Sequence, residues 1–185
     1  MKAVDKEISL VERALRVAIS AYKGQVRKDD GSPYIIHPVM VSMKLKEYSF
    51  KDVAIAAALV HDVLEDTPIT QEHLGEELGA EVLEIVLSVS EDKSLPSWEE
   101  RKKAYAQKVH SGSENAWAVS IADRIHNTES FIAAYKIEGD ELWKKFSRGK
   151  KEQVWFLELL LDTHKGWDHP LMAEFQQTVH SFKQL

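Results

Sequence analysis

Val53-Ala-Ile-Ala-Ala-Ala-Leu-Val-His-Asp-Val-Leu-Glu-Asp-Thr67 joins an apolar run to four ionisable side chains. Residues 53–60 are apolar without interruption, and an element that is apolar all round is expected in the interior. His61 and Asp62 follow directly, and Glu65 and Asp66 come within the next turn. Burying a charged group costs several kcal/mol unless that group is paired or binds a metal. The stretch therefore either ends its burial abruptly at His61 or builds a site there.

The rest of the chain has helical periodicity, with no sustained alternation of the kind that a strand shows. His37-Pro38 opens a helix with Pro38 at the first helical position. Residues 49–52 start another, which runs through the quoted stretch until Pro68 stops it. Ser97-Trp-Glu-Glu100 is a capping box. The remaining helices are expected over residues 5–23, 70–79, 80–89, 98–110, 114–135, 140–146, 150–164 and 170–183. The pattern predicts one all-α domain over residues 1–185, a compact bundle of about eight or nine helices.

Composition narrows the classes of function. The 185 residues include no cysteine, which excludes disulfides, thiolate metal sites and a cysteine nucleophile. This fits a reducing cytoplasm, where we expect the protein to work. Any bound metal must be held by histidine and carboxylate groups. No apolar run approaches the ~20 residues of a membrane span, and the N-terminus is not a secretory signal.

The net charge of −6 argues against general affinity for nucleic acid or membrane surfaces. If the substrate is anionic, positive charge has to be concentrated locally. Arg27-Lys28 and the basic run 144–151 are the two places that offer it. We expect the basic run to be a solvated face, with contact to distal phosphates as the alternative.

His61 and Asp62 are adjacent, so on a helix their side chains point about 100° apart. Both can reach one ion only near a helix end or a bend, and we expect Thr67-Pro68 to supply that bend. Imidazole plus carboxylate is a ligand set for Mn²⁺, Fe²⁺, Zn²⁺ or Co²⁺. Glu65 and Asp66 would remain available to position and deprotonate a water molecule.

Two further segments place an ionisable side chain beside apolar sequence. His37 follows Pro33-Tyr-Ile-Ile, and Asp123 follows Val119-Ser-Ile-Ala. We predict that His37 and Asp123 join His61 and Asp62 around one cation. Asn127 comes one helical turn after Asp123 on the same face and can hydrogen-bond beside it.

Three segments together carry a resemblance: Arg27-Lys-Asp-Asp-Gly-Ser-Pro-Tyr-Ile-Ile-His-Pro38, His61-Asp-Val-Leu-Glu-Asp-Thr67 and Ala122-Asp-Arg-Ile-His-Asn127. In this order they resemble the H…HD…D pattern of the HD superfamily of metal-dependent phosphohydrolases. The residues of these segments are similar to the signature segments of the (p)ppGpp hydrolase domain of Rel/Spo enzymes and of the stand-alone small alarmone hydrolases. The similar stretch runs from about residue 10 to 135.

This resemblance implies a specific site. His37, His61, Asp62 and Asp123 would hold one divalent ion, most often Mn²⁺ in these hydrolases, although another divalent metal can serve. Glu65 and Asp66 would orient and activate the water that attacks the 3′-pyrophosphate. The substrate contacts would come from Arg27 and Lys28 at the base and phosphates, and from Asn127 at the ribose or beside the metal. The products would be GDP or GTP and pyrophosphate, the partner a small nucleotide, and the protein a possible homo-oligomer.

Two departures from the family pattern leave alternatives open. Ser120 stands where relatives often carry lysine, and Asn127-Thr128-Glu129 replaces an Asn-Leu/Met-Arg segment. Another nucleotide could therefore be the substrate: (p)ppApp, NADPH or a nucleoside monophosphate. A regulator that binds a nucleotide without hydrolysing it is the alternative of a different class. We expect His126 to be structural or to line the pocket.

Overall fold

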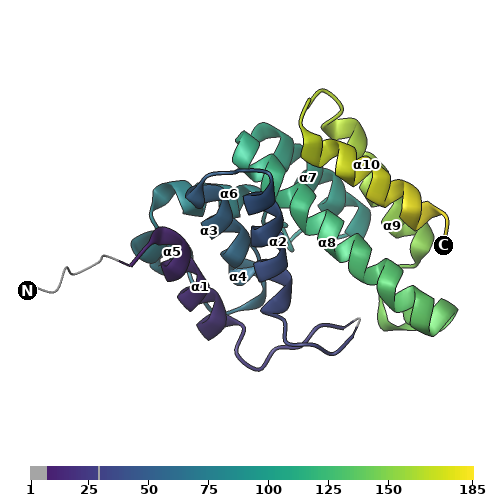
Figure 1. The fold of residues 1–185 in the computed structure, drawn as a ribbon, viewed down its shortest axis with the longest axis horizontal. Coiled ribbons are helices and arrows are strands. Elements are labelled where there is room, and N and C mark those ends of the chain that lie inside the picture. The colour runs from purple at the N-terminus through teal and green to yellow at the C-terminus, as the bar shows by residue number, and fades with distance from the viewer. Residues whose placement is uncertain (1–7, 29) are drawn as a thin grey trace, which may run out of the picture.

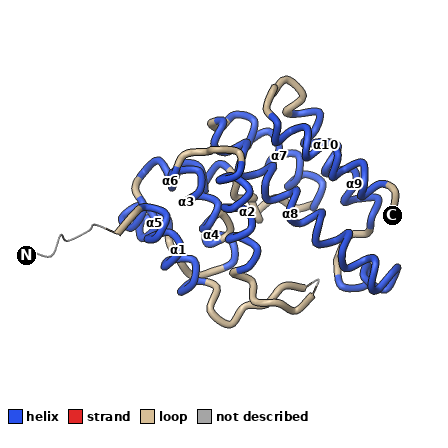
Figure 2. Tube along the Cα trace, in the orientation of Figure 1, coloured by secondary structure: helices blue, strands red, loops and turns tan. Residues whose placement is uncertain are grey.

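The computed structural model describes residues 8–28 and 30–185, and the regular elements of this part of the chain are all helices, beside one isolated β-bridge between Val26 and Pro33. Figure 2 shows helices joined by loops, with a long loop between α1 and α2, and the absence of strands among the described residues confirms the all-α prediction. The elements are α1 Leu10–Ala21, α2 Ile36–Glu47, α3 Asp52–Val60, α4 Val63–Asp66, α5 Gln71–Leu78, α6 Ala80–Ser88, α7 Trp98–Ser111, α8 Glu114–Glu138, the 3₁₀ helix η1 Gly139–Lys145, α9 Lys150–Thr163 and α10 Pro170–Lys183.

Helix α3 lies at the centre of the bundle and packs against α1, α2, α6 and α8 (Figure 1). Every residue from Ala54 to Val60 is buried. Four of these residues are alanines, whose small side chains let neighbouring helices approach closely. The uninterrupted apolar run thus forms a helix that is covered on all sides, and its C-terminal end lies inside the protein.

The chain turns at His61 and Asp62, which separate α3 from the single turn α4. Asp62 has φ −97° and ψ −2°, in the bridge region of backbone conformation where many active-site residues lie. The expectation of one continuous helix bent at Thr67-Pro68 was therefore wrong. The bend comes earlier, at His61 and Asp62 themselves.

Hydrogen-bonding side chains fix several helix starts. Ser9 accepts a hydrogen bond from the Glu12 amide at 3.2 Å and begins α1 at Leu10, later than the predicted start at residue 5; residues 5–7 lie outside the described residues. Thr70 caps α5, and Ser97 with Glu100 forms the predicted capping box of α7. Pro38 is the third residue of α2 instead of the first, still among the four whose amides have no partner within the helix.

In the second half of the chain α8 packs against α2, α3 and α10, and α9 packs against α7 and α10 (Figure 1). Phe156, Phe175 and Phe182 fill this half of the core. None of the helices in the described residues combines the length and apolar character needed to cross a membrane. The long helix α8 thus reaches from the central α3 to the C-terminal helices, and Asp123 lies near its middle.

Candidate functional site

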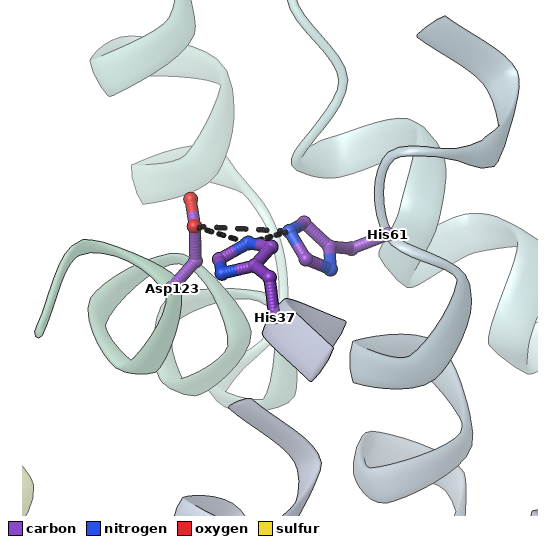
Figure 3. Close-up of side chains that lie close together, drawn as sticks. All are labelled: His37, His61 and Asp123. Atoms are coloured by element: carbon purple, nitrogen blue, oxygen red, sulfur yellow. Dashed lines mark hydrogen bonds and ion pairs between the residues drawn. The ribbon is translucent and has the colours of Figure 1, made fainter. Parts of the chain in front are cut away.

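Three polar side chains from different elements meet in the interior beside α3 (Figure 3). His37 comes from the first turn of α2, His61 follows the last residue of α3, and Asp123 comes from α8. His37 Nε2 lies 3.1 Å from Asp123 Oδ1 and 3.3 Å from His61 Nε2. His61 Nε2 lies 3.8 Å from the same carboxylate oxygen. All three side chains are buried, so water does not screen them.

Asp62, the fourth side chain expected here, lies at the edge of this cluster. Its Oδ2 is 3.2 Å from His61 Nε2 and 4.0 Å from His37 Nε2. The turn between α3 and α4 brings it there, because adjacent residues on a continuous helix would diverge. The structure thus brings His37, His61, Asp62 and Asp123 together.

The ring nitrogens of His61 show which protonation state the fold favours. His61 Nδ1 lies 2.8 Å from the carbonyl oxygen of Ala58, which can only accept a hydrogen bond. Nδ1 must therefore carry the proton, and a neutral ring then presents a lone pair at Nε2 toward the cluster. Metal-binding histidines are oriented in this way, by donating the other ring N–H to a carbonyl or carboxylate.

Burial and the neighbouring charges compete at this cluster. Burial lowers the pKa of His61, but the carboxylates of Asp62 and Asp123 outweigh burial and hold that pKa well above its ordinary value. Burial raises the pKa of Asp123, yet Arg124 and the two histidines hold it well below the usual range. Burial also lowers the pKa of His37. The carboxylates of Asp62 and Asp123 thus favour a positive charge in the cluster. In the metal-free protein they favour the protonated form of His61.

Neighbouring side chains hold the two carboxylates in place. Arg124 forms an ion pair with Asp123 Oδ2, which leaves Oδ1 facing the histidines. Asn127 Nδ2 donates to Asp123 Oδ1 at 2.5 Å. The hydroxyl of Tyr34 donates to Asp62 Oδ2. Each carboxylate is thus oriented by a partner outside the cluster.

These donor atoms fit a divalent cation. Nitrogen lone pairs of two neutral histidines and two carboxylate oxygens converge within 4.0 Å, and such atoms repel one another unless positive charge lies among them. Imidazole with carboxylate suits Mn²⁺, Fe²⁺, Co²⁺ or Zn²⁺. His37, His61, Asp62 and Asp123 are therefore a chemically coherent set of metal ligands.

Glu65 and Asp66 lie on the one-turn helix α4, directly after the cluster. Glu65 Oε1 accepts the backbone amide of Glu91 at 3.0 Å, and burial raises the pKa of Glu65. Asp66 is more exposed, and its Oδ1 lies 3.1 Å from Lys93 Nζ. Lys93 Nζ also donates to the backbone carbonyl of Glu65 at 2.8 Å and lies 3.6 Å from Glu65 Oε2. The loop between α6 and α7 thus holds both carboxylates.

A cavity of about 390 Å³ lies on the other side of Asp66, and Arg27, Lys28 and Asn127 line it. Tyr34, Phe131 and Phe146 add aromatic surface to the same cavity. Arg27 Nη2 donates to Asn127 Oδ1 at 3.5 Å, and Asn127 in turn contacts Asp123. All three side chains expected to contact a substrate therefore face one cavity, which Asn127 connects to the histidine–aspartate cluster.

The two departures from the family pattern lie away from this cavity. Glu129 points toward α2, with an oxygen 3.9 Å from Lys44 Nζ, and it does not line the cavity. Ser120 is buried, and its hydroxyl lies 2.9 Å from that of Tyr105. Neither departure therefore adds a side chain to the lining of this cavity, and α8 directs Glu129 to another face.

Much of the basic run 144–151 is paired within the protein. Lys144 contacts Glu141 at 2.6 Å, Lys145 contacts Glu138 at 2.7 Å, and Lys150 donates to the backbone carbonyl of Lys183 at 3.2 Å. Phe146 is the one residue of this run among those that line the cavity. These pairs favour the interpretation of the run as a solvated, neutralised face.

The side chains that contact the predicted site residues include Tyr34, Lys93, Arg124 and His126. Sequence reasoning assigned no role to Tyr34 or Arg124, and it left open whether Lys93 is a surface residue or supports the site. Tyr34 and Arg124 stand inside the quoted motif segments, so their position was a usable signal. Lys93 lies in a loop distant in sequence from Glu65, and only the fold brings the two together. His126 was expected to be structural or to line the pocket, and it lies 2.8 Å from His37 between their Nδ1 atoms.

Comparisons with family models and with curated proteins agree on one family. The model of the HD domain matches residues 14–151. The mouse guanosine-3′,5′-bis(diphosphate) 3′-pyrophosphohydrolase MESH1 is 36% identical over 124 residues, which cover 65% of this chain and 69% of the mouse protein. A Haemophilus influenzae guanosine-3′,5′-bis(diphosphate) 3′-pyrophosphohydrolase is 38% identical over 117 residues, 60% of this chain but 17% of that longer protein.

A solved structure supports the fold independently. A metazoan ortholog of SpoT, described as hydrolysing ppGpp and playing a role in starvation responses, superposes with a TM-score of 0.79. The match covers 96% of this chain and 98% of the other, at 23% sequence identity. At that identity the likeness concerns the helical architecture alone.

Proposed function

The chain belongs to the HD-domain family, and on this premise we propose that it is a divalent-metal-dependent hydrolase that removes the 3′-pyrophosphate of (p)ppGpp. The observation that carries the proposal is the placement of His37, His61, Asp62 and Asp123 next to a cavity lined by Arg27, Lys28 and Asn127. Relatives that share 36–38% of aligned residues bear the name of this activity.

The metal ligands are His37, His61, Asp62 and Asp123, and we assign Mn²⁺ as the cation. A bound divalent cation would supply Lewis acidity and neutralise charge on the phosphoryl group under attack. The hydrogen bonds of His61 to Ala58, of Tyr34 to Asp62 and of Arg124 to Asp123 hold these ligands before any cation arrives. Such preorganisation lowers the reorganisation required during the reaction.

Glu65 serves as the general base. Its Oε1 is occupied by the Glu91 amide, so Oε2 is the oxygen that we assign to receive the proton of the attacking water. Burial raises the pKa of Glu65, which makes it a stronger base than an exposed glutamate. Asp66 lines the cavity and orients the water from the opposite side.

The cavity holds the nucleotide. Arg27 and Lys28 supply the positive charge that phosphates require, and this local charge matters because the whole chain carries a net charge of −6. Phe131 and Phe146, with ring centroids 4.6 Å apart, offer apolar surface for the base. Water adds to the phosphorus that is bonded to the ribose 3′ oxygen while Glu65 takes one of its protons, and the bond between this phosphorus and the 3′ oxygen breaks. The 3′ oxygen takes up a proton and becomes the 3′ hydroxyl of GDP or GTP, and the diphosphoryl group is released as pyrophosphate.

The test is turnover of ppGpp by the purified chain with Mn²⁺, with the nucleotide products separated by anion-exchange chromatography. We expect GDP and pyrophosphate, loss of turnover on chelation, and loss in Glu65→Gln while Mn²⁺ still binds. Glu81→Gln on the exposed face of α6 is the matched control and should behave as the wild type.

Parallel reactions with ppApp, NADPH and AMP separate the alternatives. Cleavage of one of these in place of ppGpp would keep the metal-dependent reaction and change the substrate. Binding of Mn²⁺ and ppGpp with no turnover of any nucleotide would contradict the enzyme and favour a nucleotide-binding regulator.

A further inference from the structure

His126 contacts a predicted metal ligand directly. It lies on α8, three residues after Asp123, and its Nδ1 is 2.8 Å from Nδ1 of His37. The two rings have centroids 5.0 Å apart and an interplanar angle of 45°. A separation of 2.8 Å between two ring nitrogens is a hydrogen-bond distance, so one of these atoms carries a proton and the other accepts it.

The surroundings of His37 decide which nitrogen donates. His37 Nε2 faces His61 Nε2 at 3.3 Å and Asp123 Oδ1 at 3.1 Å, in the space where the cation would bind. To act as a ligand, Nε2 must offer a lone pair. A neutral imidazole has a single N–H, which must then lie on Nδ1 and point at His126. With His37 as a ligand, His126 Nδ1 is therefore the acceptor, which requires the proton of a neutral His126 to lie on its Nε2.

The other tautomer of His37, with its proton on Nε2, competes with this arrangement. If the His37 proton moved to Nε2, it would be donated to Asp123 Oδ1, and the lone pair needed for a cation would be lost. With its own proton on Nε2, His126 opposes this shift, because the lone pairs of the two Nδ1 atoms would then face each other at 2.8 Å without a proton between them. His61 solves the same problem with the backbone carbonyl of Ala58, which no substitution removes.

We propose that His126 is a positioning residue that holds His37 in the Nδ1–H tautomer and so prepares its Nε2 to bind the cation. The inference rests on the metal site of the proposed function. In this role His126 acts through the metal ligand His37 and contacts neither the metal nor the nucleotide. Partners of this kind typically change metal affinity by about 10- to 100-fold when they are removed.

Two substitutions separate the hydrogen bond from the space that the ring fills. His126→Leu fills much of the volume but removes the acceptor. His126→Asn places the side-chain oxygen near the position of Nδ1 and keeps the acceptor. His180→Leu, on the exposed face of α10, is the control for loss of a histidine.

Mn²⁺ affinity is measured from the electron paramagnetic resonance signal of free Mn²⁺. We expect His126→Leu to weaken binding by about 10- to 100-fold, His126→Asn to stay close to the wild type, and His180→Leu to match it. Nitrogen-15 NMR of the histidine rings in metal-free protein supplies a second measurement. The wild type and His126→Asn should show His37 protonated at Nδ1, and His126→Leu should show a shift toward Nε2.

The outcomes separate this inference from the proposed function. If wild-type protein binds Mn²⁺ and His126→Leu binds it equally well with an unchanged His37 tautomer, His126 has no positioning role and the inference fails alone. If His126→Asn loses as much affinity as His126→Leu, the ring and not its acceptor matters, which also overturns it. If the wild type binds no divalent cation, both the metal site and the inference are wrong.

Discussion

Glu65 and Asp66 are adjacent in the chain but lie in different surroundings. Glu65 is half-buried and receives the Glu91 amide, whereas the Asp66 side chain is 47% exposed and faces the cavity. Lys93 contacts both residues from a distant loop. At the scale of single residues, the site thus consists of reactive side chains and of partners that fix their direction, and substitutions can test each partner.

Replacing Lys93 with methionine should lower kcat while leaving Mn²⁺ affinity unchanged. Lys93 Nζ donates to the backbone carbonyl of Glu65 at 2.8 Å and to Asp66 Oδ1 at 3.1 Å, and it lies 3.6 Å from Glu65 Oε2. Its loss therefore removes a hydrogen bond of the Asp66 carboxylate and the positive charge beside both carboxylates. An exposed ion pair of this kind is worth about 0.2–1 kcal/mol, so we expect kcat to fall by up to roughly fivefold. Lys108→Met is the control, because Lys108 lies nearby but binds the Ser90 carbonyl. Equal kcat in both variants would show that Lys93 positions neither carboxylate.

Replacing Tyr34 with phenylalanine should weaken Mn²⁺ binding by roughly tenfold and leave the fold intact. The hydroxyl of Tyr34 donates to Asp62 Oδ2, and without it the carboxylate is free to rotate away from His61. The readout is the Mn²⁺ dissociation constant, with urea unfolding of the metal-free protein alongside. Tyr135→Phe removes a surface hydroxyl that bonds Asp140 and should leave the constant unchanged. An unaltered constant in Tyr34→Phe would mean that Asp62 needs no such support.

At the scale of elements, two local features build the site. The turn at His61 and Asp62 ends α3 inside the protein and points adjacent side chains at the same place. The loop between α6 and α7 carries Glu91 and Lys93 back to α4, and the capping box at Ser97 fixes where this loop ends. The start of α7 at Ser97 thus defines the C-terminal end of the loop that contacts Glu65.

Ser97→Ala should lower the free energy of unfolding by about 1 kcal/mol. Ser97 Oγ accepts the Glu100 amide at 3.1 Å and contacts Glu100 Oε2 at 2.8 Å, so the substitution leaves an amide of the first turn of α7 without its side-chain partner. Urea denaturation measures the change. Ser111→Ala, at the C-terminal end of α7, should alter the free energy of unfolding by much less, and an equal loss in both variants would contradict the capping role.

At the scale of the whole molecule, the histidines make opposite contributions to stability. His61 has its pKa raised by neighbouring carboxylates, whereas burial lowers the pKa of His37 and of His164. His164 ends α9 and is buried against the rings of His110 and Trp117, at centroid distances of 5.5 and 5.3 Å. These ring contacts include none of the predicted metal ligands, so its effect on folding can be measured separately from theirs.

His164 should make the protein less stable as the pH falls below about 6.5. Its pKa is lower in the folded protein than in the unfolded chain, so the unfolded chain binds more protons in that window. The stabilisation is complete above the unfolded pKa and is lost as the pH falls toward the folded pKa. The measurement is the free energy of unfolding between pH 7.5 and 5.5 for the wild type and for His164→Asn, whose amide can still donate to Leu160. Parallel pH dependence in both proteins would contradict this prediction.

Much of the architecture follows from patterns within a few residues of each other. The apolar run 53–60 predicts a buried helix, Ser97 with Glu100 predicts a helix start, and the structure has both. The motif segments also indicate which side chains to bring together, and the structure places His37, His61, Asp62 and Asp123 within 4.0 Å of a neighbour in the set. Local patterning carries this information because helix periodicity and capping act within one or two turns.

The sequence by itself therefore determined an all-α chain with histidines and carboxylates at the ends or in the middle of buried helices. Only the tertiary structure decided that the bend lies at His61 and Asp62, that Glu129 faces away from the cavity, and that Lys93 and His126 support the site. The physical reason is that these contacts join side chains up to 89 residues apart. Their distances depend on how α2, α4 and α8 pack around α3, which no local pattern of the chain encodes.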